Sequence, residues 1–432
     1  MTGPLLTLLK AARAISYARE MAATRGAPVV PLFWAASDDH DLDEIHHTFA
    51  LNSQGEAQKL RLDLDGSRGA AGEVAVPLQL GAEIARELFA VASIDPAALP
   101  IEPWLPHPGD TLASWFCRSL RQALGAHAPA IVEPAQLAAA ARPYFDQALR
   151  DDGAIGRALA EGTAANQAAG LAAPLPVEDE PPLFLIEKGA RTRIRRGARA
   201  GEFLVGERTF SRAALLDLAT SGVPRLSANV ALRTIVQAGC LPTLAYVAGP
   251  TELLYYRQLE PLHRLFGVPF PTLVHRPHAT LLTTDAARAA RKLGIAPDQL
   301  LAALDARGSA PATRSPLLDR GAALRREVGA YVEELLALSP AVKSAAERRA
   351  TQLLQSFDGV LERAGSALAD GDKSDGARWS TLAAVVRPRG KPQERVLNVL
   401  PFLAQRGPTL IDELLTLRGE PGADGVVPHT VL

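Results

Sequence analysis

The sequence is poor in cysteine and methionine, with two of each in 432 residues, and only 5% of its residues are aromatic. Cys117 and Cys240 lie far apart, so they offer neither a disulfide framework nor a C-x-x-C metal or redox pair. Lys and Arg (46) nearly balance Asp and Glu (47), so no net field attracts nucleic acid or an anionic membrane. We therefore expect a cytoplasmic protein without nucleic-acid or membrane partners.

Long hydrophobic runs and several familiar motifs are also missing. The most apolar window, residues 234–256, is interrupted by Gln237, Pro242, Pro250 and Glu252, and no basic leader precedes an apolar run at the N-terminus. The sequence contains neither the G-x-x-x-x-G-K-[ST] phosphate loop nor the G-x-S-x-G nucleophile elbow. The glycine-rich segment 66–72 precedes an expected strand rather than a helix, which favours a hairpin turn over a phosphate site.

Apolar residues make up 47% of the chain and charged residues 22%, which predicts a globular protein of two or three packed units. Apolar spacing predicts a helix at 5–23, and the apolar run 29–36 predicts a buried parallel strand. Polar residues 37–41 follow this strand, where an α/β sheet binds its ligands. The same pattern resumes further along the chain, with a helix at 228–238, a strand at 244–248, a helix at 251–266 and a strand at 272–275.

Two stretches interrupt this α/β pattern. In the first, alternation predicts strands at 60–64 and 74–80. The second combines an Ala-, Gly- and Pro-rich connection at 151–182 with strands at 183–210, and its basic run 191–199 fits a solvated strand edge or hairpin better than an anion site. Helices are expected between the two interruptions, at 111–125 and 135–150.

Beyond residue 315 the apolar spacing changes to alternating steps of four and three. The first series runs Leu324, Val328, Tyr331, Leu335, Leu338, and a second follows Ser339-Pro340 as Ala346, Ala350, Leu353, Phe357, Val360, Ala364, Ala367. Two heptad helices joined by a proline turn predict a projecting coiled-coil hairpin that self-associates. The alternative is a pair of ordinary amphipathic helices packed on the core.

We therefore predict an α/β fold whose core is interrupted by two insertions and followed by a C-terminal α-helical coiled-coil hairpin. The expected segments are core at 1–51, first insertion at 52–110, core at 111–150, second insertion at 151–226, core at 227–290, coiled-coil domain at 291–390 and a return to the core at 391–432.

The densest polar cluster follows the first buried strand and comprises Asp38, Asp39, His40, Asp41, Asp43, Glu44, His46 and His47. For any one of these acids, helix capping is the simpler role. Like charges crowded at a ligand edge raise one another's pKa, which favours a functional cluster. On a helix, His40, Glu44 and His47 would share a face, but proton transfer by His40 is a better hypothesis than a permanent metal.

A second constellation lies at the next expected strand end. Asn229, Arg233 and Gln237 would share one helix face, and Arg233 offers either a carboxylate or phosphate fork or one half of a buried ion pair. Gly249-Pro250 would let a ligand approach the backbone, although a simple turn explains it equally well.

Taken in order, these motifs resemble those of the bacillithiol cysteine-adding enzymes. The matching runs are Pro31–Trp34, Asp39–Glu44 with His47, Ser227–Arg233, Leu241–Thr243, Ala245–Val247, Gly249–Glu252 and Pro392–Asn398. The resemblance implies a Rossmann-like core with two connecting insertions, and a homodimer paired through the coiled coil. It implies a ligase that joins L-cysteine to glucosaminyl malate in the last step of bacillithiol biosynthesis. It also implies a catalytic centre at Asp39, His40, Asp41 and His47. Implied substrate- or nucleotide-binding residues are Thr2, Gly3, Lys10, Asn229, Arg233, Gln237, Gly249, Glu252 and Tyr256.

Amide formation from a free carboxylate is uphill in water, so ATP is the expected cosubstrate, although the H-I-G-H and K-M-S-K-S strings of class I synthetases are absent. Compared with the family pattern, the chain starts inside the motif that ends in Thr2-Gly3-Pro4, so a first strand and loop are expected to be missing. The alternative hypothesis is a truncated, inactive dimeric relative that binds a nucleotide or metabolite.

Overall fold

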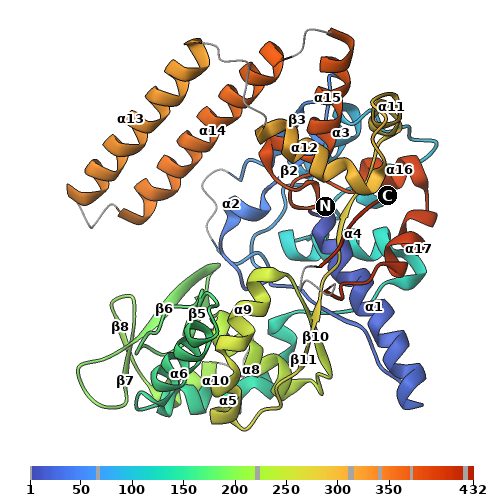
Figure 1. Ribbon diagram of the computed structural model, residues 1–432. Helices are drawn as coiled ribbons and strands as arrows, with labels where there is room; N and C mark the ends of the chain where they lie inside the picture. The colour runs from blue at the N-terminus through green and yellow to red at the C-terminus, as the bar shows by residue number, and fades with distance from the viewer. Residues whose placement is uncertain are drawn as a thin grey trace. The chain divides into compact units, whose positions relative to one another are not determined.

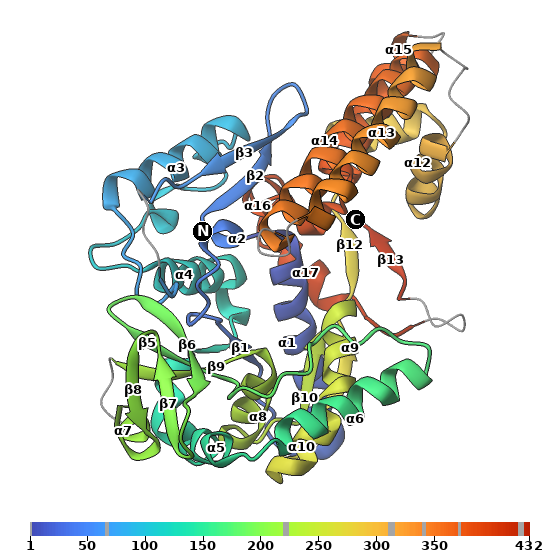
Figure 2. The same cartoon turned by 90° about the vertical axis from the view of Figure 1, so that its left-hand side faces the viewer.

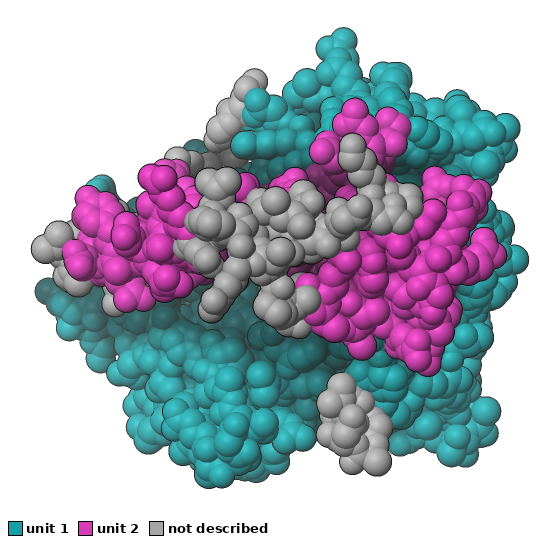
Figure 3. All heavy atoms as spheres, turned by 45° about the horizontal axis from the view of Figure 1, so that its top comes forward, with its two compact units in different colours: residues 1–50, 58–278, 398–429 teal, residues 51–57, 279–397, 430–432 magenta. Residues whose placement is uncertain are grey.

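The computed structural model describes residues 2–64, 69–218, 224–309, 316–338, 343–369, 373–421 and 427–432. The chain forms two compact units, which Figure 3 shows in teal and magenta. The first unit comprises residues 1–50, 58–278 and 398–429, and the second comprises residues 51–57, 279–397 and 430–432.

The first unit contains two pairs of short parallel strands; β10 and β11 are labelled in Figure 1, and β1 is labelled in Figure 2. β1 (Leu32–Trp34) pairs with β4 (Ala130–Val132), and β10 (Ala245–Ala248) pairs with β11 (Thr272–His275). Helix α1 (Leu5–Arg25) packs against both β1 and β10, and it ends where Gly26 adopts a left-handed conformation (φ 63°). The predicted helix, the parallel pairing and the strand at 272–275 are confirmed. The first strand is shorter than its apolar run and is not buried as predicted, because Leu32 is exposed and Phe33 and Trp34 are only partly buried.

The helices of the first unit occupy most of the expected positions. They are α2 (Leu42–Ile45), α3 (Leu78–Val91), α4 (Leu112–Leu124), α5 (Ala138–Arg150), α6 (Ala154–Ala168), α7 (Arg212–Leu218), α8 (Val230–Cys240), α9 (Pro250–Gln258), α10 (Glu260–Phe266), α16 (Leu400–Arg406) and α17 (Thr409–Thr416). The helix expected at 251–266 is divided at Leu259, where Pro261 starts a new helix. Strands β2 (His47–Leu51) and β3 (Ala57–Arg61) pair near the predicted 60–64 strand.

A five-stranded antiparallel sheet fills the second insertion, in the order β8-β7-β6-β5-β9. Its strands are β5 (Leu183–Glu187), β6 (Ala190–Arg196), β7 (Glu202–Val205), β8 (Arg208–Ser211) and β9 (Arg225–Ala228). The basic run forms β6, between β5 and β7, so the hairpin interpretation is confirmed and an edge position is wrong. Leu185 and Ile194 point into the same core as Phe203.

Two predictions for the first unit are wrong. The stretch 74–80 forms only an isolated bridge between Ala75 and Thr111 before α3 begins at Leu78. The connection expected at 151–182 contains helix α6, because Ile155, Ala158, Leu159 and Gly162 place a buried face at helical spacing. A Cβ on Gly162 would lie 1.9 Å from the Gln258 carbonyl oxygen, so glycine permits the close approach of α6 and α9.

The second unit is mainly helical. It contains α11 (Thr284–Lys292), α12 (Leu300–Ser309), α13 (Pro316–Leu338), α14 (Lys343–Ala369) and α15 (Lys373–Val386). Strand β12 (His278–Thr280) pairs with β13 (His429–Val431), which lies near the C-terminus. Leu282, Leu300, Leu382 and Val386 belong to its buried cluster.

The motif at 392–398 holds the second unit together. Buried Gln393 accepts from the Leu281 amide (2.8 Å) and donates to the carbonyls of Leu281 and Val385, while the Glu394 carboxylate accepts from the Ala279 amide (3.1 Å). These side chains thus form hydrogen bonds with buried backbone groups, which need partners because they are shielded from water. The motif therefore has a structural role.

Helices α13 and α14 lie side by side, as Figures 1 and 2 show, and the predicted hairpin is confirmed. Arg325 donates two hydrogen bonds to Asp358, from Nε and Nη2, both at 2.8 Å. This bidentate pair fixes the register of the two helices. The Ser339-Pro340 turn lies outside the described residues.

Candidate functional site

The loop after β1 is anchored by a buried ion pair. Arg225 donates from Nη2 to Asp38 Oδ1 (2.8 Å) and from Nη1 to Glu73 Oε1 (2.5 Å), and both Asp38 and Arg225 are buried. Asp39 Oδ1 accepts from the backbone amides of His40 (2.8 Å) and Asp41 (3.3 Å), which forms an Asx turn. Asp38 and Asp39 thus shape the loop, and the charge of Asp38 is compensated locally.

His40 is held by an arginine that sequence reasoning left without a function. Arg191 of β6 lies 3.3 Å from His40, from Nη1 to Nδ1, and donates from Nη2 to the Ala228 carbonyl (2.8 Å). Because a guanidinium only donates, Nδ1 of His40 accepts, and the ring proton of neutral His40 resides on Nε2. Arg191 also covers the Phe184 ring, 4.1 Å from its centre. No sequence signal links residues 40 and 191, because only the sheet brings them together.

The helical face proposed for His40, Glu44 and His47 is wrong. Helix α2 contains only four residues, so His40 precedes it and His47 begins β2. His47 packs edge-on against His46 and Phe49, and burial lowers its pKa. Asp41 occupies the N-cap position of α2 without a capping hydrogen bond from its side chain. His47 and His40 therefore share no helix face.

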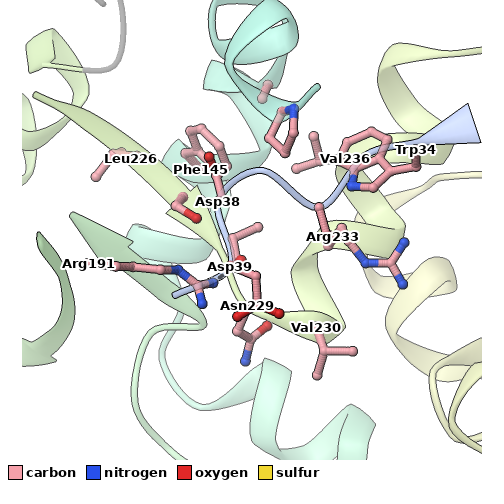
Figure 4. A pocket seen from close by; sticks show the side chains of 15 residues that line it. Trp34, Asp38, Asp39, Phe145, Arg191, Leu226, Asn229, Val230, Arg233 and Val236 are labelled. Atoms are coloured by element: carbon pink, nitrogen blue, oxygen red, sulfur yellow. Dashed lines mark hydrogen bonds between the residues drawn. The ribbon is translucent and has the colours of Figure 1, made fainter. Parts of the chain in front are cut away.

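A pocket of about 340 Å³ opens beside this loop. Figure 4 shows Arg191 reaching from the sheet toward the loop that carries Asp38 and Asp39, with α8 opposite. Its lining residues are Trp34, Ala36, Asp38, Asp39, Pro134, Ala141, Phe145, Arg191, Leu226, Ser227, Ala228, Asn229, Val230, Arg233 and Val236. The mixture of apolar walls with a few polar groups is typical of small-molecule sites. The pocket joins Asp38 and Asp39 of the first constellation with Asn229 and Arg233 of the second, whereas His40, Asp41 and His47 are not among its described lining residues.

Asn229 and Arg233 reach this pocket from α8. Asn229 caps the helix, because its Oδ1 accepts from the amides of Ala231 and Leu232, both at 3.0 Å. Arg233 donates to Gln237 Oε1 (3.2 Å) and to the Tyr255 hydroxyl (3.0 Å). Burial alone lowers the pKa of Arg233, but its tyrosine neighbours and Glu252 outweigh burial and raise it. Arg233 therefore stays charged.

A polar network behind Arg233 centres on Glu252. Lys10 donates to both carboxylate oxygens, at 2.6 and 2.8 Å, and the Gly249 amide donates to Oε2 (2.9 Å). The hydroxyls of Tyr246 (2.7 Å) and Tyr255 (3.3 Å) donate to Oε1. Since Tyr255 also accepts from Arg233, Glu252 and Lys10 support the position of that guanidinium. Sequence reasoning named Lys10, Gly249 and Glu252 but missed the part played by Tyr246 and Tyr255.

The remaining predicted residues occupy structural positions. Tyr256 is 1% exposed and packs against the rings of Tyr246 and Tyr255, and burial raises its pKa well above the ordinary value. Thr2 is fully buried and donates to Asn398 Oδ1 (3.4 Å), while Gly3 adopts a left-handed conformation (φ 68°).

Asn398 in turn donates to the Thr48 hydroxyl (3.0 Å), so this part of the predicted site ties three segments of the first unit together.

Among the described residues, no group of three or more His, Cys, Asp or Glu side chains is arranged to hold a metal ion. Within the same residues, no helix combines the length and apolar character required to cross a bilayer.

Comparison with known proteins identifies both parts of the chain. Residues 1–277 match the bacillithiol biosynthesis BshC N-terminal Rossmann-like domain, and residues 317–422 match the BshC C-terminal coiled-coil domain. Relatives from Solibacter usitatus (27% identical), Koribacter versatilis (28%) and Heliobacterium modesticaldum (29%) are each named "Putative cysteine ligase BshC". These alignments cover 94%, 96% and 96% of this chain and 78%, 80% and 78% of the relatives. The chain therefore belongs to the bacillithiol biosynthesis BshC family.

Proposed function

We propose that this protein is a ligase that forms an amide between the carboxyl group of L-cysteine and the amino group of glucosaminyl malate. The observation that supports it is the pocket at the strand ends of a BshC-family Rossmann-like domain, which Asp39, Asn229 and Arg233 line together with Arg191. His40 does not line the pocket itself, but it contacts Arg191, which does. His40 is suited to proton transfer, because an imidazole can both accept and donate a proton and Arg191 fixes its tautomer.

We also propose ATP as the cosubstrate, because a free carboxylate must be activated before an amine can displace one of its oxygens. The pocket offers the guanidinium groups of Arg191 and Arg233 and the N-terminus of α8, a donor set that suits an anionic group. Arg191, Arg233 and the N-terminus of α8 are therefore suited to binding an anionic group of the ligand.

The direct test is incubation of the purified protein with L-cysteine, glucosaminyl malate and ATP, with the amide product detected by mass spectrometry. Omission of each reactant in turn should prevent product formation. Binding of the substrates without any product would favour the alternative of an inactive binding protein.

Arg233→Lys tests whether the Arg233 guanidinium binds the ligand. Lysine retains the charge but cannot reproduce two bonds in a fixed fork, so we expect ligand binding to weaken about ten-fold with the melting temperature nearly unchanged. Calorimetric titration with each substrate, together with melting curves, checks this. A large fall in melting temperature with binding intact would instead assign Arg233 a purely structural role.

We further propose that the protein is a homodimer that pairs through α13 and α14. Large apolar side chains remain exposed along this hairpin, namely Leu324, Tyr331, Leu335, Leu353 and Val360. Leu353 and Val360 lie seven residues apart on α14, as do Leu324 and Tyr331 on α13, so each pair lies on one helix face. Contiguous exposed apolar surface of this kind commonly marks an interface.

The double substitution Leu353→Glu and Val360→Glu should convert the dimer to a monomer in sedimentation experiments at micromolar concentration, because charges replace the apolar contact surface. Gln355→Glu, at an exposed position of the same helix, is the matched control and should remain dimeric. A monomeric unmodified protein at that concentration would refute the interface.

A further inference from the structure

Three buried hydrogen-bonding atoms of the pocket lining have no partner among the described residues. They are the indole nitrogen of Trp34, Nε of Arg191 and the hydroxyl oxygen of Ser227. All three are also shielded from solvent, so bulk water does not satisfy them. A buried polar group without a partner costs free energy, and natural proteins contain few of them. All three atoms belong to residues that line the same pocket, so a ligand bound there is a candidate partner for them.

Ser227 is the clearest case. It is 1% exposed, and it stands in β9 opposite Phe184 of β5, so the strand pairing fixes its backbone. An alanine there would fill nearly the same space without an unsatisfied hydroxyl. Rotation about the Cα–Cβ bond gives the hydroxyl three staggered positions, which lets it turn toward the pocket that Ser227 lines.

Trp34 supplies a second donor from the carboxyl end of β1. Its ring stands beside α8, and Figure 4 shows the indole nitrogen on the side of the ring that faces the other labelled residues. An indole N–H donates and never accepts. A ligand group that pairs with Trp34 must therefore carry an acceptor, and the Ser227 hydroxyl can donate to the same group.

The pocket lining also carries charged groups. Arg191 and Arg233 each contribute a positive charge, and Asp38 and Asp39 each contribute a negative charge. Asp38 is paired with Arg225, and Asp39 Oδ1 accepts from the backbone amides of His40 and Asp41, whereas both guanidinium groups remain donors. The N-terminus of α8 also opens at the pocket, through Asn229 and Val230, and a helix N-terminus favours anions. A carboxylate combines a negative charge with two acceptor oxygens, so it matches the unpaired donors and the helix N-terminus.

We propose that Ser227 and Trp34 are ligand-binding residues that donate hydrogen bonds to a carboxylate of the small molecule held in this pocket. Both proposed substrates contain such a group, the amino acid carboxylate of cysteine and the malyl carboxylates of glucosaminyl malate. The inference rests on the proposed function only for the identity of the molecule that supplies the carboxylate.

The test measures binding of L-cysteine, L-malate and cysteamine by calorimetric titration. Cysteamine is cysteine without its carboxylate and should bind poorly. Ser227→Ala should weaken binding of the carboxylate-bearing probe about ten-fold, because a hydrogen bond to a charged group is lost. Trp34→Phe should weaken binding of the same probe. If the variants lose binding of cysteine alone, the bound carboxylate is that of cysteine. If they lose binding of malate alone, it is a malyl carboxylate.

Ser119→Ala is a matched control. Ser119 of α4 is also fully buried with an unpaired hydroxyl, but it does not line the pocket. Both serine substitutions should leave the melting temperature unchanged or slightly raised, and only Ser227→Ala should affect binding.

Unchanged binding of both carboxylates in Ser227→Ala, equal weakening in Ser119→Ala, or no binding of either probe by the unmodified protein at millimolar concentration would overturn the inference.

The failure of the proposed function is distinguishable from these outcomes. A protein that binds a carboxylate through Ser227 but forms no cysteinyl amide would refute the ligase and leave the inference standing. An active ligase whose KM values are unchanged by Ser227→Ala would refute the inference alone.

Discussion

Glu252→Gln is expected to lower stability at neutral pH by about 3 kcal/mol and to flatten its dependence on acid pH. Burial alone raises the pKa of Glu252, but Lys10, the Gly249 amide and the Tyr246 hydroxyl outweigh it and lower the pKa from 4.5 to about 2. A carboxylate whose pKa falls on folding stabilises the folded state above its unfolded pKa. This contribution is fully present above about pH 5 and is lost as the pH falls from 4.5 toward 2.

Melting curves of the unmodified protein and of Glu252→Gln at pH 7, 5 and 3 check this prediction. The difference between the two proteins should be largest at pH 7 and should shrink at pH 3. The amide keeps the shape of the side chain but leaves the ammonium of Lys10 without its counter-charge.

Glu161→Gln is the control, because Glu161 and Arg264 form an exposed ion pair that contributes little. Equal stability of Glu252→Gln and the unmodified protein at pH 7 would show that the network does not stabilise the fold.

Local signals sufficed for much of the fold. The helix α1 was predictable because its apolar residues recur at helical spacing and Gly26 terminates it, and β11 because a short apolar run lies between turns. The hairpin of α13 and α14 followed from heptads alone. Helix α6 was missed because its alanines and glycines resemble a linker in composition, whereas its buried face depends on packing against α9.

The site was only partly predictable, because long-range contacts build it. Arg191 meets His40 through a sheet inserted more than a hundred residues further along the chain. The basic run of β6 resembles a solvated hairpin, and nothing local distinguishes Arg191 from Arg193, which pairs with Glu178. Likewise, a serine in a strand gives no sign that its hydroxyl lacks a partner. Trp34 and Ser227 become candidates only once burial and hydrogen bonding are known.

His40→Gln is expected to abolish bacillithiol production in a bacterium whose own cysteine-adding enzyme has been deleted, with stability unchanged or slightly raised. Loss of a general acid or base typically slows a reaction at least 100-fold. Glutamine can still interact with Arg191, but it cannot exchange a proton near neutral pH. The ring of His40 is half exposed, so its removal costs little packing.

Asp41→Asn should have the same effect on thiol production. A capping role predicts the opposite, a loss of about 0.5–2 kcal/mol in stability with production retained. The structure weighs against capping, because the Asp41 side chain makes no capping hydrogen bond at the start of α2. His127→Gln serves as the control, since His127 pairs with Asp412 on the surface and belongs neither to the loop after β1 nor to the pocket lining. Thiol levels and melting curves of the same variants decide between the roles, and full complementation by both variants would remove this cluster from the catalytic residues.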